Sequence, residues 1–495
     1  MKSVFDKLQM FSLLLIALCI TSPVRSKAAQ SANGPAQSVN NSQEQPVIVG
    51  KIGDYIITKE DLRKQFLIEL YPNEYEPFDE NAKPADANSV LMKMVAEKAM
   101  IIEARKQGYL EEDSNNRALK RFRERGLISL LVQNYLQEVK DKITATEPEI
   151  QKMIQADPNT DPNRAKLVIE NSKARNIVSQ YYRQIYEKSN VKKLSENYPQ
   201  AIQIHDRLLN HPKVPQRMKF IRETQIKDEM TPEERNIVLA TYDGGKVTLE
   251  DWLNTLCESS PPSRPKNLDT PEGIDQLLER ALAVPLYIAQ AKLQKLDQDE
   301  NYIMQVKDYQ DRILLNSANS EMYKKVQEPS TEEMIAYFNN NKEIFRVGRF
   351  MKIDIIWCQD LETARRVRAE LDGGKNFEAV KQEYSLDKGL KPYNTYPGSE
   401  GLFWKGLWQA EPNDIAGPIK GFFRQQIKWR IVKILEKNAG ELKEYSADMS
   451  NRVKDKIMSE RREALLAEYR RELLKKHPHE VYPEKIRDID PLDIP

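Results

Sequence analysis

One pattern occurs twice in this chain and limits the possible folds more than any other feature. Residues 48–62 read IVGKIGDYIITKEDL, and residues 237–252 read IVLATYDGGKVTLEDW. In both, an apolar strand turns at Gly and Asp, a second strand follows, and a helix begins at Thr-x-x-Asp. That spacing is typical of a capping box, with Asp as a shorter stand-in for Glu. Each segment therefore predicts a strand hairpin that leads directly into a helix.

Later segments repeat in the same order. The helical pattern of residues 94–110 has a counterpart at residues 281–296, and we expect a long charged helix after each. Ser/Thr-x-x-Glu helix starts then follow at Thr146 and at Ser330. We interpret this ordered series as a duplication. The alternative is that two unrelated helical domains share common helix caps.

The two copies differ by an insert. In the first copy, the helix near Thr146 joins almost directly to a further helical stretch, whereas in the second copy the counterpart of that stretch begins only after residue 440. We expect these divisions of the chain: a signal peptide at 1–28, a flexible leader at 29–46, a first helical module at 47–197, a connection at 198–235, a second helical module at 236–346, the insert at 347–440, a closing helix of the second module at 441–480 and a tail at 481–495.

The composition favours helices and excludes several classes of function. Charged residues make up 31% of the 495 residues, whereas Gly occurs only 18 times. Lys plus Arg number 76 against 75 Asp plus Glu, and a protein that binds nucleic acid is usually more basic. The three Cys include no Cys-x-x-Cys pair and the four His show no ligand spacing, so we expect no metal. Because no nucleotide-binding or nucleophile-elbow motif occurs, we expect no cofactor either.

The first residues have the pattern of a secretory signal peptide. Lys2 and Lys7 precede the apolar run Met10–Ile20, and a polar stretch follows up to Ala28. An uncleaved membrane anchor fits less well, because the run is shorter than the ~20 residues that span a bilayer. We therefore expect cleavage near Ala28, export to the periplasm or another extracytoplasmic compartment, and no stable membrane insertion.

The insert differs in pattern from the helical modules. Residues 351–358 alternate like a strand, and residues 361–371 form an amphipathic helix that ends at a Gly pair. A second helix is expected at 376–385, a strand–turn–strand at 415–423 and a final strand at 429–437. This order of elements predicts a small α+β domain.

Three runs in the insert resemble a known family. Ala364–Ser385, the run DIAGPIK at Asp414–Lys420 and the run WRIVKILE at Trp429–Glu436 resemble the parvulin-type peptidyl-prolyl isomerase domain. The duplicated modules are similar to the N-terminal chaperone domain of SurA-like and PrsA-like foldases. The resemblance implies a mainly α fold, with duplicated SurA N-terminal-like modules and an inserted α+β parvulin-like domain. It also implies a chaperone whose partners are unfolded or exported polypeptides, and no nucleic acid.

The sequence departs from the family where parvulins carry their active site. The family usually places one His on the first strand and one on the last strand. Here the first position falls at Asp354 or Ile353 and the last at Arg430, and the acidic residue of the family's loop corresponds to Glu400. We interpret these as degenerate positions and assign no catalytic residue among them.

Prolyl isomerisation breaks no covalent bond, so an isomerase must bind the twisted imide better than either planar form. That requires an apolar pocket for the ring, and Arg430 would place a permanent cation beside it. A weak or inactive parvulin-like domain in a chaperone is therefore our interpretation. The alternatives are an active parvulin-type isomerase and a structural periplasmic scaffold.

Aromatic residues are dense in the second half of the insert, where they are candidates for binding clients. The alternative is that a small domain needs them for its core. The candidates are Leu402, Phe403, Trp404, Trp408, Phe422 and Trp429. The sequence leaves open the oligomeric state and whether Cys257 and Cys358 form a disulfide.

Overall fold

The computed structural model describes residues 46–70, 86–210, 220–424, 426–490 and 492. The expected signal peptide and all but the last residue of the expected leader lie outside these residues, as does part of the expected connection. The described residues divide into two compact units, one built from residues 113–310 and the other from residues 46–112 together with 311–492. Among the described residues, none of the helices has the length and apolar character needed to cross a bilayer.

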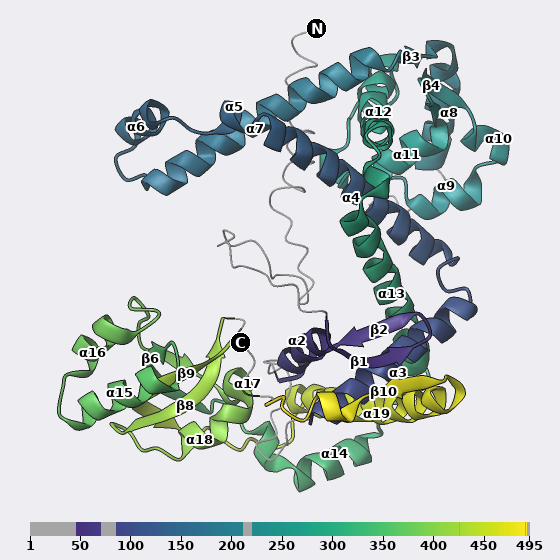
Figure 1. Ribbon diagram of the computed structural model, residues 1–495. Coiled ribbons are helices and arrows are strands. Elements are labelled where there is room, and N and C mark those ends of the chain that lie inside the picture. Colours follow the sequence, from purple (N-terminus) through teal and green to yellow (C-terminus); the bar gives the residue numbers. More distant parts are fainter. Residues whose placement is uncertain (1–45, 71–85, 211–219, 425, 491, 493–495) are drawn as a thin grey trace. The chain divides into compact units, whose positions relative to one another are not determined.

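The expected hairpin of the first copy lies in the second of these units. Two antiparallel strands lead into a helix and then a longer helix, and a strand from the far end of the sequence pairs with β1 (Figure 1). These elements are β1 (Ile48–Ile52), β2 (Tyr55–Thr58), α2 (Lys59–Leu70), α3 (Ala87–Lys106) and β10 (His479–Val481).

The hairpin of the second copy lies in the other unit and has the same arrangement. It consists of β4 (Val238–Tyr242), β5 (Gly245–Thr248), α11 (Leu249–Glu258) and α12 (Pro271–Leu293), with β3 (Lys192–Lys193) paired to β4. In both sheets, the third strand, which pairs with the first strand of the hairpin, comes from the other copy.

The two hairpins agree in detail, which supports the duplication. The register is the same in both when residue numbers differ by 190, and each has a bulge after its first paired residue, Ile48 or Val238. Thr58 and Asp61 form a capping box in which the Asp61 backbone N–H donates to Thr58 Oγ1 at 3.1 Å. Thr248 and Asp251 form the matching bond at 3.2 Å.

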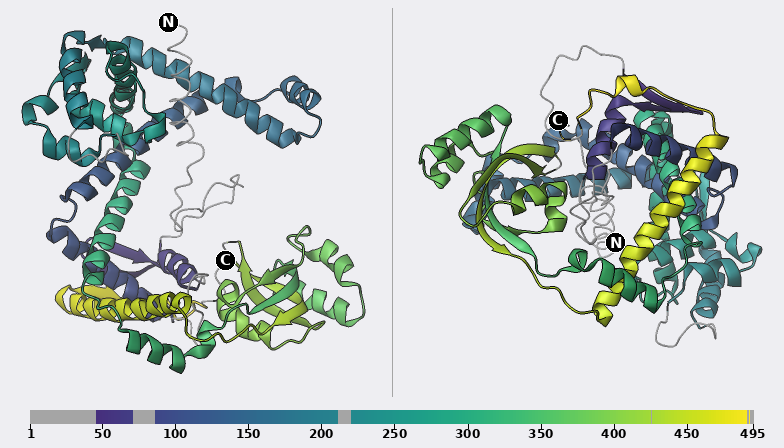
Figure 2. Two further views of the ribbon diagram at one scale, coloured as in Figure 1. Left: turned by 180° about the vertical axis from the view of Figure 1, so that it is seen from behind. Right: turned by 90° about the horizontal axis from the view of Figure 1, so that it is seen from below.

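The copies exchange their closing elements. The core of the residue 113–310 unit combines α4 and α7 of the first copy with β4, α11 and α12 of the second. In the other unit, the hairpin and α3 of the first copy pack with part of α13 and with α19 of the second (Figure 2). The long helices concerned are α4 (Asp113–Glu138), α7 (Pro162–Lys188), α13 (Glu300–Tyr323) and α19 (Ala447–Lys476). The expected modules at 47–197 and 236–346 therefore do not coincide with the compact units.

A buried polar cluster fixes α13 to the first hairpin. Asp311 of α13 accepts hydrogen bonds from the Tyr55 hydroxyl at 2.8 Å and from Arg105 Nη2 at 2.9 Å. Burial and the bond to Asp311 raise the pKa of Tyr55 to about 12. A hydrogen bond to a charged group stabilises more than a neutral one, so this cluster favours the exchanged arrangement.

The expected connection at 198–235 is also a packed part of its unit. It contains α8 (Tyr198–Leu209), α9 (Glu223–Glu229) and α10 (Pro232–Arg235). Tyr198, Ile204 and Leu208 lie on one face of α8 and belong to the unit's apolar core. Pro232 lies in the first turn of α10, where proline is well tolerated.

The parvulin-like domain, residues 347–440, is an α+β domain as expected. Its four-stranded antiparallel sheet has the order β7-β6-β9-β8. The strands are β6 (Phe350–Cys358), β7 (Tyr393–Thr395), β8 (Ile415–Phe423) and β9 (Gln426–Asn438), and the main helices are α15 (Leu361–Asp372) and α16 (Phe377–Tyr384). The strand–turn–strand expected at 415–423 is wrong, because these residues form one strand with an irregularity between Ala416 and Ile419.

The ends of this domain meet at one point of the helical module. Val347 and Glu441 exchange two backbone hydrogen bonds, at 3.0 and 2.9 Å. Nearby, α14 (Thr331–Asn340) packs on α19, and Phe338, Phe345 and Val453 form a small apolar cluster there. The chain therefore enters and leaves the domain through a single pair of neighbouring residues.

Candidate functional site

The pairing of β6 with β9 decides which residues share a face of the sheet. Trp357 lies opposite Arg430, so both side chains point to the same face. Because side chains alternate along a strand, Ile353 and Ile355 share that face and Asp354 lies on the other. Of the two possible first-strand positions, only Ile353 therefore shares the face of Arg430. The structure does not bring Asp354 and Arg430 together.

Arg430 is instead paired with Glu400. Arg430 Nη2 donates to Glu400 Oε2 at 2.5 Å, and Nη1 reaches Oε1 at 3.4 Å. The Thr395 hydroxyl donates to the same Oε1 at 2.7 Å. Arg430 is 1% exposed and Glu400 is 4% exposed, so the pair is screened very little by water. Two of the three degenerate positions thus form one buried ion pair.

The guanidinium of Arg430 is tightly enclosed. Its Cζ lies 5.2 Å from the centre of the Trp357 ring. On the other side is Gly421, where an added Cβ would lie 2.3 Å from Arg430 Nε. Glycine at position 421 therefore makes room for the guanidinium. Arg430 Nε has no hydrogen-bond partner among the described residues.

Arg430 occupies the last-strand position for which the resemblance implies an imidazole. Arginine stays protonated in proteins, so Arg430 cannot act as a neutral imidazole does. Its Nη donors are directed at Glu400 rather than at an approaching carbonyl. Opening the pair to admit a substrate would leave a buried charge without its partner, which typically costs about 3–5 kcal/mol.

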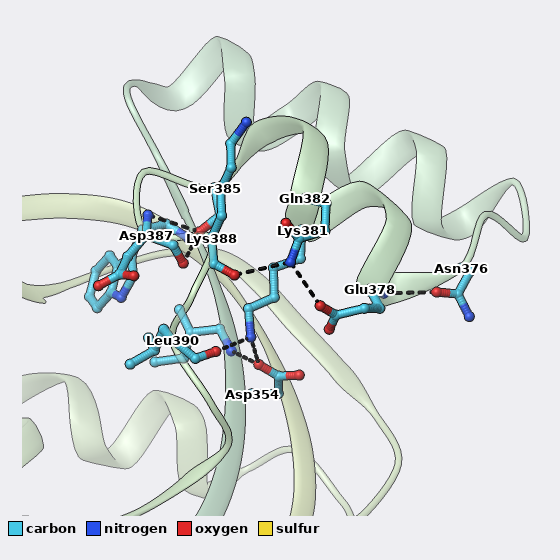
Figure 3. Close-up of polar contacts among 11 residues, drawn as sticks. Asp354, Asn376, Glu378, Lys381, Gln382, Ser385, Asp387, Lys388 and Leu390 are labelled. Carbon is cyan, nitrogen blue, oxygen red and sulfur yellow. Dashed lines mark hydrogen bonds and ion pairs between the residues drawn. The ribbon is translucent and has the colours of Figure 1, made fainter. Parts of the chain in front are cut away.

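Asp354 takes part in a second buried ion pair on the opposite face (Figure 3). Lys381, on α16, contacts Asp354 Oδ1 and donates to the Leu390 carbonyl at 2.5 Å. Asp354 Oδ1 also accepts from the Ile355 backbone N–H at 2.9 Å. With all these contacts inside the domain, Asp354 connects the sheet to α16 and to the loop that follows.

The six aromatic and apolar candidates divide into core and partly buried residues. Trp404 is 0% exposed and stacks on Trp408 at 5.1 Å, so Trp404 is a core residue. Phe403 is 9% exposed and lies edge-to-face with Phe422 at 5.1 Å. Leu402, Trp408, Phe422 and Trp429 are half-buried. Client binding by any of these six residues stays a prediction. The complete burial of Trp404 counts against client binding by that residue.

Sequence reasoning missed three residues of these sites. Lys381 lies on the inward face of α16, beside Val380 and Phe377, and a Lys in such an apolar stripe signals a buried acidic partner. Asp354 was the only acidic residue of the strand Met351–Cys358. Thr395 and Gly421 gave no comparable signal, because their roles depend on the fold around Glu400 and Arg430.

The described residues contain no group of three or more His, Cys, Asp or Glu side chains that could hold a metal ion. Cys257 and Cys358 are both free thiols. Burial raises the pKa of Cys257 to about 11 and that of Cys358 to about 12. A raised pKa lowers the fraction of each thiol that is present as the thiolate, which is the reactive form.

Comparisons with known proteins agree with the resemblance inferred from the insert. No protein-family model matches the chain. It is 26% identical over 169 residues to YacD of Bacillus subtilis, provisionally named a peptidyl-prolyl cis-trans isomerase; the match covers 31% of this chain and 54% of that protein. It is 24% identical over 184 residues to the foldase protein PrsA of Caldanaerobacter subterraneus, covering 37% of this chain and 57% of PrsA. The chain thus spans little more than half the length of these relatives.

Among solved structures, one SurA-like chaperone of Campylobacter jejuni aligns with 50% of this chain and 100% of its own length. The identity is 15% and the TM-score is 0.25. The two relatives found by sequence confirm the resemblance to a PrsA-like foldase and to a protein named for prolyl isomerisation.

Proposed function

We propose that this protein is an extracytoplasmic folding chaperone that holds unfolded or exported polypeptides and whose parvulin-like domain does not accelerate prolyl isomerisation. The observation that carries the proposal is the buried Arg430–Glu400 pair, with the side chains 2% and 5% exposed. It occupies the face of the sheet on which the family's imidazoles are expected. The similarity to a foldase supports the chaperone part.

Apolar side chains on exposed helix faces support holding by the helical modules. They include Leu167 and Val168 on α7, Leu293 on α12, and Ile303 and Met304 on α13, all at least 43% exposed. In this proposal these side chains contact a client weakly and without sequence preference, which suits a chaperone that must release it. The signal-peptide pattern supports a location outside the cytoplasm.

Two assays on one preparation test the proposal. The first measures suppression of aggregation of two unrelated, chemically unfolded proteins, and we expect suppression of both at equimolar amounts. The second follows isomerisation of a prolyl peptide, and we expect no acceleration over the uncatalysed reaction. Suppression of only one client would support a scaffold with a fixed partner.

The second candidate function is an active isomerase, which the name of the YacD relative favours. Under that function the full-length protein would accelerate the prolyl peptide, and Trp408→Ala would remove the acceleration. Arg430→Lys is the matched variant, because it keeps the charge but loses the second branch of the guanidinium. If the protein accelerates prolyl isomerisation and the acceleration depends on these residues, the proposal of an inactive domain is wrong. Client holding is then judged by the aggregation assay alone.

A further inference from the structure

The helix pair formed by α6 (Glu147–Ala156) and the first half of α7 has a counterpart in α14 and α19 of the second copy. The N-cap of α6 is Thr146 and that of α14 is Ser330, and both form a capping box. Each of these two helices has ten residues. Figure 1 shows α6 at the end of α7 that lies away from α12. A residue of α14 thus corresponds to the residue of α6 whose number is 184 lower, as Ser330 corresponds to Thr146.

The correspondence between α7 and α19 follows from the closing strands. Lys192 of β3 and Glu480 of β10 pair with equivalent positions of the two hairpins. The helix α7 ends at Lys188 and α19 ends at Lys476, each four residues before that paired residue. A residue of α19 thus corresponds to the residue of α7 whose number is 288 lower.

One ion pair occurs in both helix pairs at corresponding positions. In the first copy, Lys173 Nζ of α7 lies 2.6 Å from Glu149 Oε2 of α6. In the second copy, Arg461 Nη2 of α19 lies 3.0 Å from Glu333 Oε1 of α14. The numbers of the two cations differ by 288 and those of the two carboxylates by 184, as the closing strands and the helix caps require. The two helix pairs are therefore packed in the same way.

Residues that flank the parvulin-like domain cover the helix pair of the second copy. The ring centre of Phe345 lies 5.7 Å from that of Phe338 and 6.2 Å from that of Tyr337, both on α14. The ring centre of Tyr445 lies 5.7 Å from that of Phe338. Phe338 is 3% exposed and Phe345 is 1% exposed. Phe345 precedes the domain and Tyr445 follows it, so the second copy covers this face with its own flanking segments.

The first copy has no such flanking segments. Its helices α6 and α7 are joined by residues 157–161, DPNTD, which include no aromatic, Leu, Ile, Val or Met side chain. Ile154 of α6 corresponds to Phe338 of α14 and is half-buried. Met153 corresponds to Tyr337 and is half-buried as well. The positions that the flanking segments cover in the second copy are therefore only partly covered in the first.

Val168 of α7 lies beside Met153, as the contacts of their counterparts indicate. The counterpart of Val168 is Lys456, whose Nζ lies 3.6 Å from Glu460 Oε1. The hydroxyl of Tyr337, the counterpart of Met153, donates to the same oxygen at 2.7 Å. Val168 is 43% exposed, so the first copy presents an apolar side chain where the second has a charged one. The open face of the α6–α7 pair is the name we give to Met153, Ile154 and Val168.

We propose that the open face binds a short apolar stretch of another polypeptide, with an aromatic side chain seated on Met153 and Ile154. The second copy indicates the chemistry of this ligand, because Phe345 is seated on the corresponding residues and follows Ile344. Met153 is unbranched and adapts to side chains of different shape, so the ligand is an aromatic residue with an aliphatic neighbour rather than one sequence. The inference deepens the chaperone function and rests on it only for the statement that these ligands are clients.

The size of the open face decides between a client segment and a second copy of this chain. Stable protein interfaces bury at least ~1,200 Å² in total. The open face consists of three side chains, of which Val168 is the most exposed at 43%. Two such faces therefore fall far short of the area that a stable dimer needs. A short segment that binds and leaves again needs no such area.

A binding measurement with a peptide tests the proposal. The probe is a fluorescently labelled peptide with the sequence NKEIFRVG, residues 341–348 of this chain, capped at both ends. Fluorescence anisotropy with the full-length protein should show saturable binding. Ile154→Asp should weaken the binding at least about tenfold, because the aromatic ring would then cover a charge. Ile68→Asp on α2 is the matched control, since it adds the same charge at an exposed Ile outside the open face and should leave the affinity unchanged.

Further variants separate the site from a general loss of structure. Circular dichroism compares each variant with the unchanged protein. If Ile154→Asp fails to fold, Val168→Asp serves as the second site variant, because Val168 is already 43% exposed. In the probe, Ala in place of Phe345 should abolish binding, whereas Ala in place of Glu343 should preserve it.

A photo-reactive benzoyl-phenylalanine at the Phe345 position of the probe locates the site. Cross-links to the full-length protein, mapped by peptide mass spectrometry, should fall on α6 and on α7 near Val168. Cross-links on α14 alone would show that the probe displaces the chain's own Phe345, and the proposal would then be wrong.

Equal affinity of the probe for the unchanged protein and for folded site variants would overturn the proposal, as would no saturable binding at all. A dimer that Ile154→Asp dissociates, measured by sedimentation, would assign the open face to a second copy and contradict the proposal as well. The chaperone function has a different readout. If the probe binds as expected but the protein suppresses no aggregation, the peptide site stands and the holding function fails. If aggregation is suppressed but the probe does not bind, holding stands and this site is wrong.

Discussion

Arg430 and Trp357 lie opposite each other on paired strands, and the guanidinium sits 5.2 Å from the centre of the indole ring. Glu400 completes the enclosure by accepting from both branches of the guanidinium. Removing one member of a buried ion pair leaves the other charge buried without compensation. Removing both members leaves no buried charge. This asymmetry makes the site testable through stability as well as activity.

Glu400→Gln should destabilise the parvulin-like domain by about 3–5 kcal/mol, because Arg430 would stay buried without its counter-charge. The double change of Glu400→Leu and Arg430→Met should cost far less. Trp357, Trp404 and Trp408 report on this domain, so urea unfolding followed by tryptophan fluorescence measures the change. A Glu400→Gln protein that unfolds at the original urea concentration would contradict the ion-pair assignment.

The exchange of closing strands predicts which engineered cysteines can be linked. Lys51 lies opposite Glu480, and Lys192 lies opposite Thr241. Opposite residues of antiparallel strands have Cα atoms about 4.5–5.5 Å apart. Cysteine pairs at 51/480 and at 192/241 should therefore be joined by a short bifunctional thiol reagent.

The control pair places cysteines at 51 and 192, where the strands of the first copy would meet if that copy closed on itself. We expect no link within the chain for this pair, measured by peptide mass spectrometry. Efficient linking at 51/192 with none at 51/480 would show that each copy closes on its own strand.

His205 predicts a loss of stability in mild acid. Its side chain is buried against Trp252, with ring centres 6.0 Å apart, and burial lowers its pKa in the folded protein. The unfolded chain therefore binds a proton more readily, and stability falls as pH drops below the usual histidine pKa of about 6.5. His205→Gln should lower the thermal midpoint at pH 7.5 but make it less sensitive to pH between 7.5 and 5.5. An unchanged pH dependence in the variant would show that His205 does not contribute.

Cys257 and Cys358 should react slowly with iodoacetamide at pH 8. With a pKa of about 11, the Cys257 thiol is about 0.1% thiolate at that pH, roughly 100-fold below an ordinary exposed cysteine. Cys358, with a pKa of about 12, should be slower still. Both should label fully in denaturant. Peptides joined through Cys257 and Cys358 under non-reducing conditions would contradict the free thiols.

Local features of the fold were predictable because they depend on neighbours in the sequence. Thr58 and Thr248 each start a helix as their Thr-x-x-Asp spacing indicates, since a capping box needs only four residues. The expected limits of the insert stay a prediction; Val347 and Glu441, which lie there, pair with each other. The exchange of closing strands was not predictable. Because the copies carry equivalent hairpins, β1 can accept either β3 or β10 without a change in pattern.

The candidate site was predictable only in part, because it depends on long-range pairing. Arg430 and Glu400 were recognised from their motifs. The two residues are 30 positions apart in the sequence, so their contact depends on the tertiary fold. The face of Asp354 followed from its register against β9, where the pairing shifts between Lys352 and Ile353. Whether an aromatic residue such as Trp404 is core or surface depends on packing that no local pattern contains.

The pairing of Gly50 with Val481 has a consequence for the order in which the protein is made. One edge of β1 stays open until a strand about 430 residues further along the chain has been synthesised. Open strand edges are sites of aggregation, and contacts between distant residues form slowly. A chain interrupted before residue 479 therefore exposes that edge permanently. The first sheet of this protein is completed only by residues 479–481, so the growing chain is itself in need of protection until these residues have been synthesised.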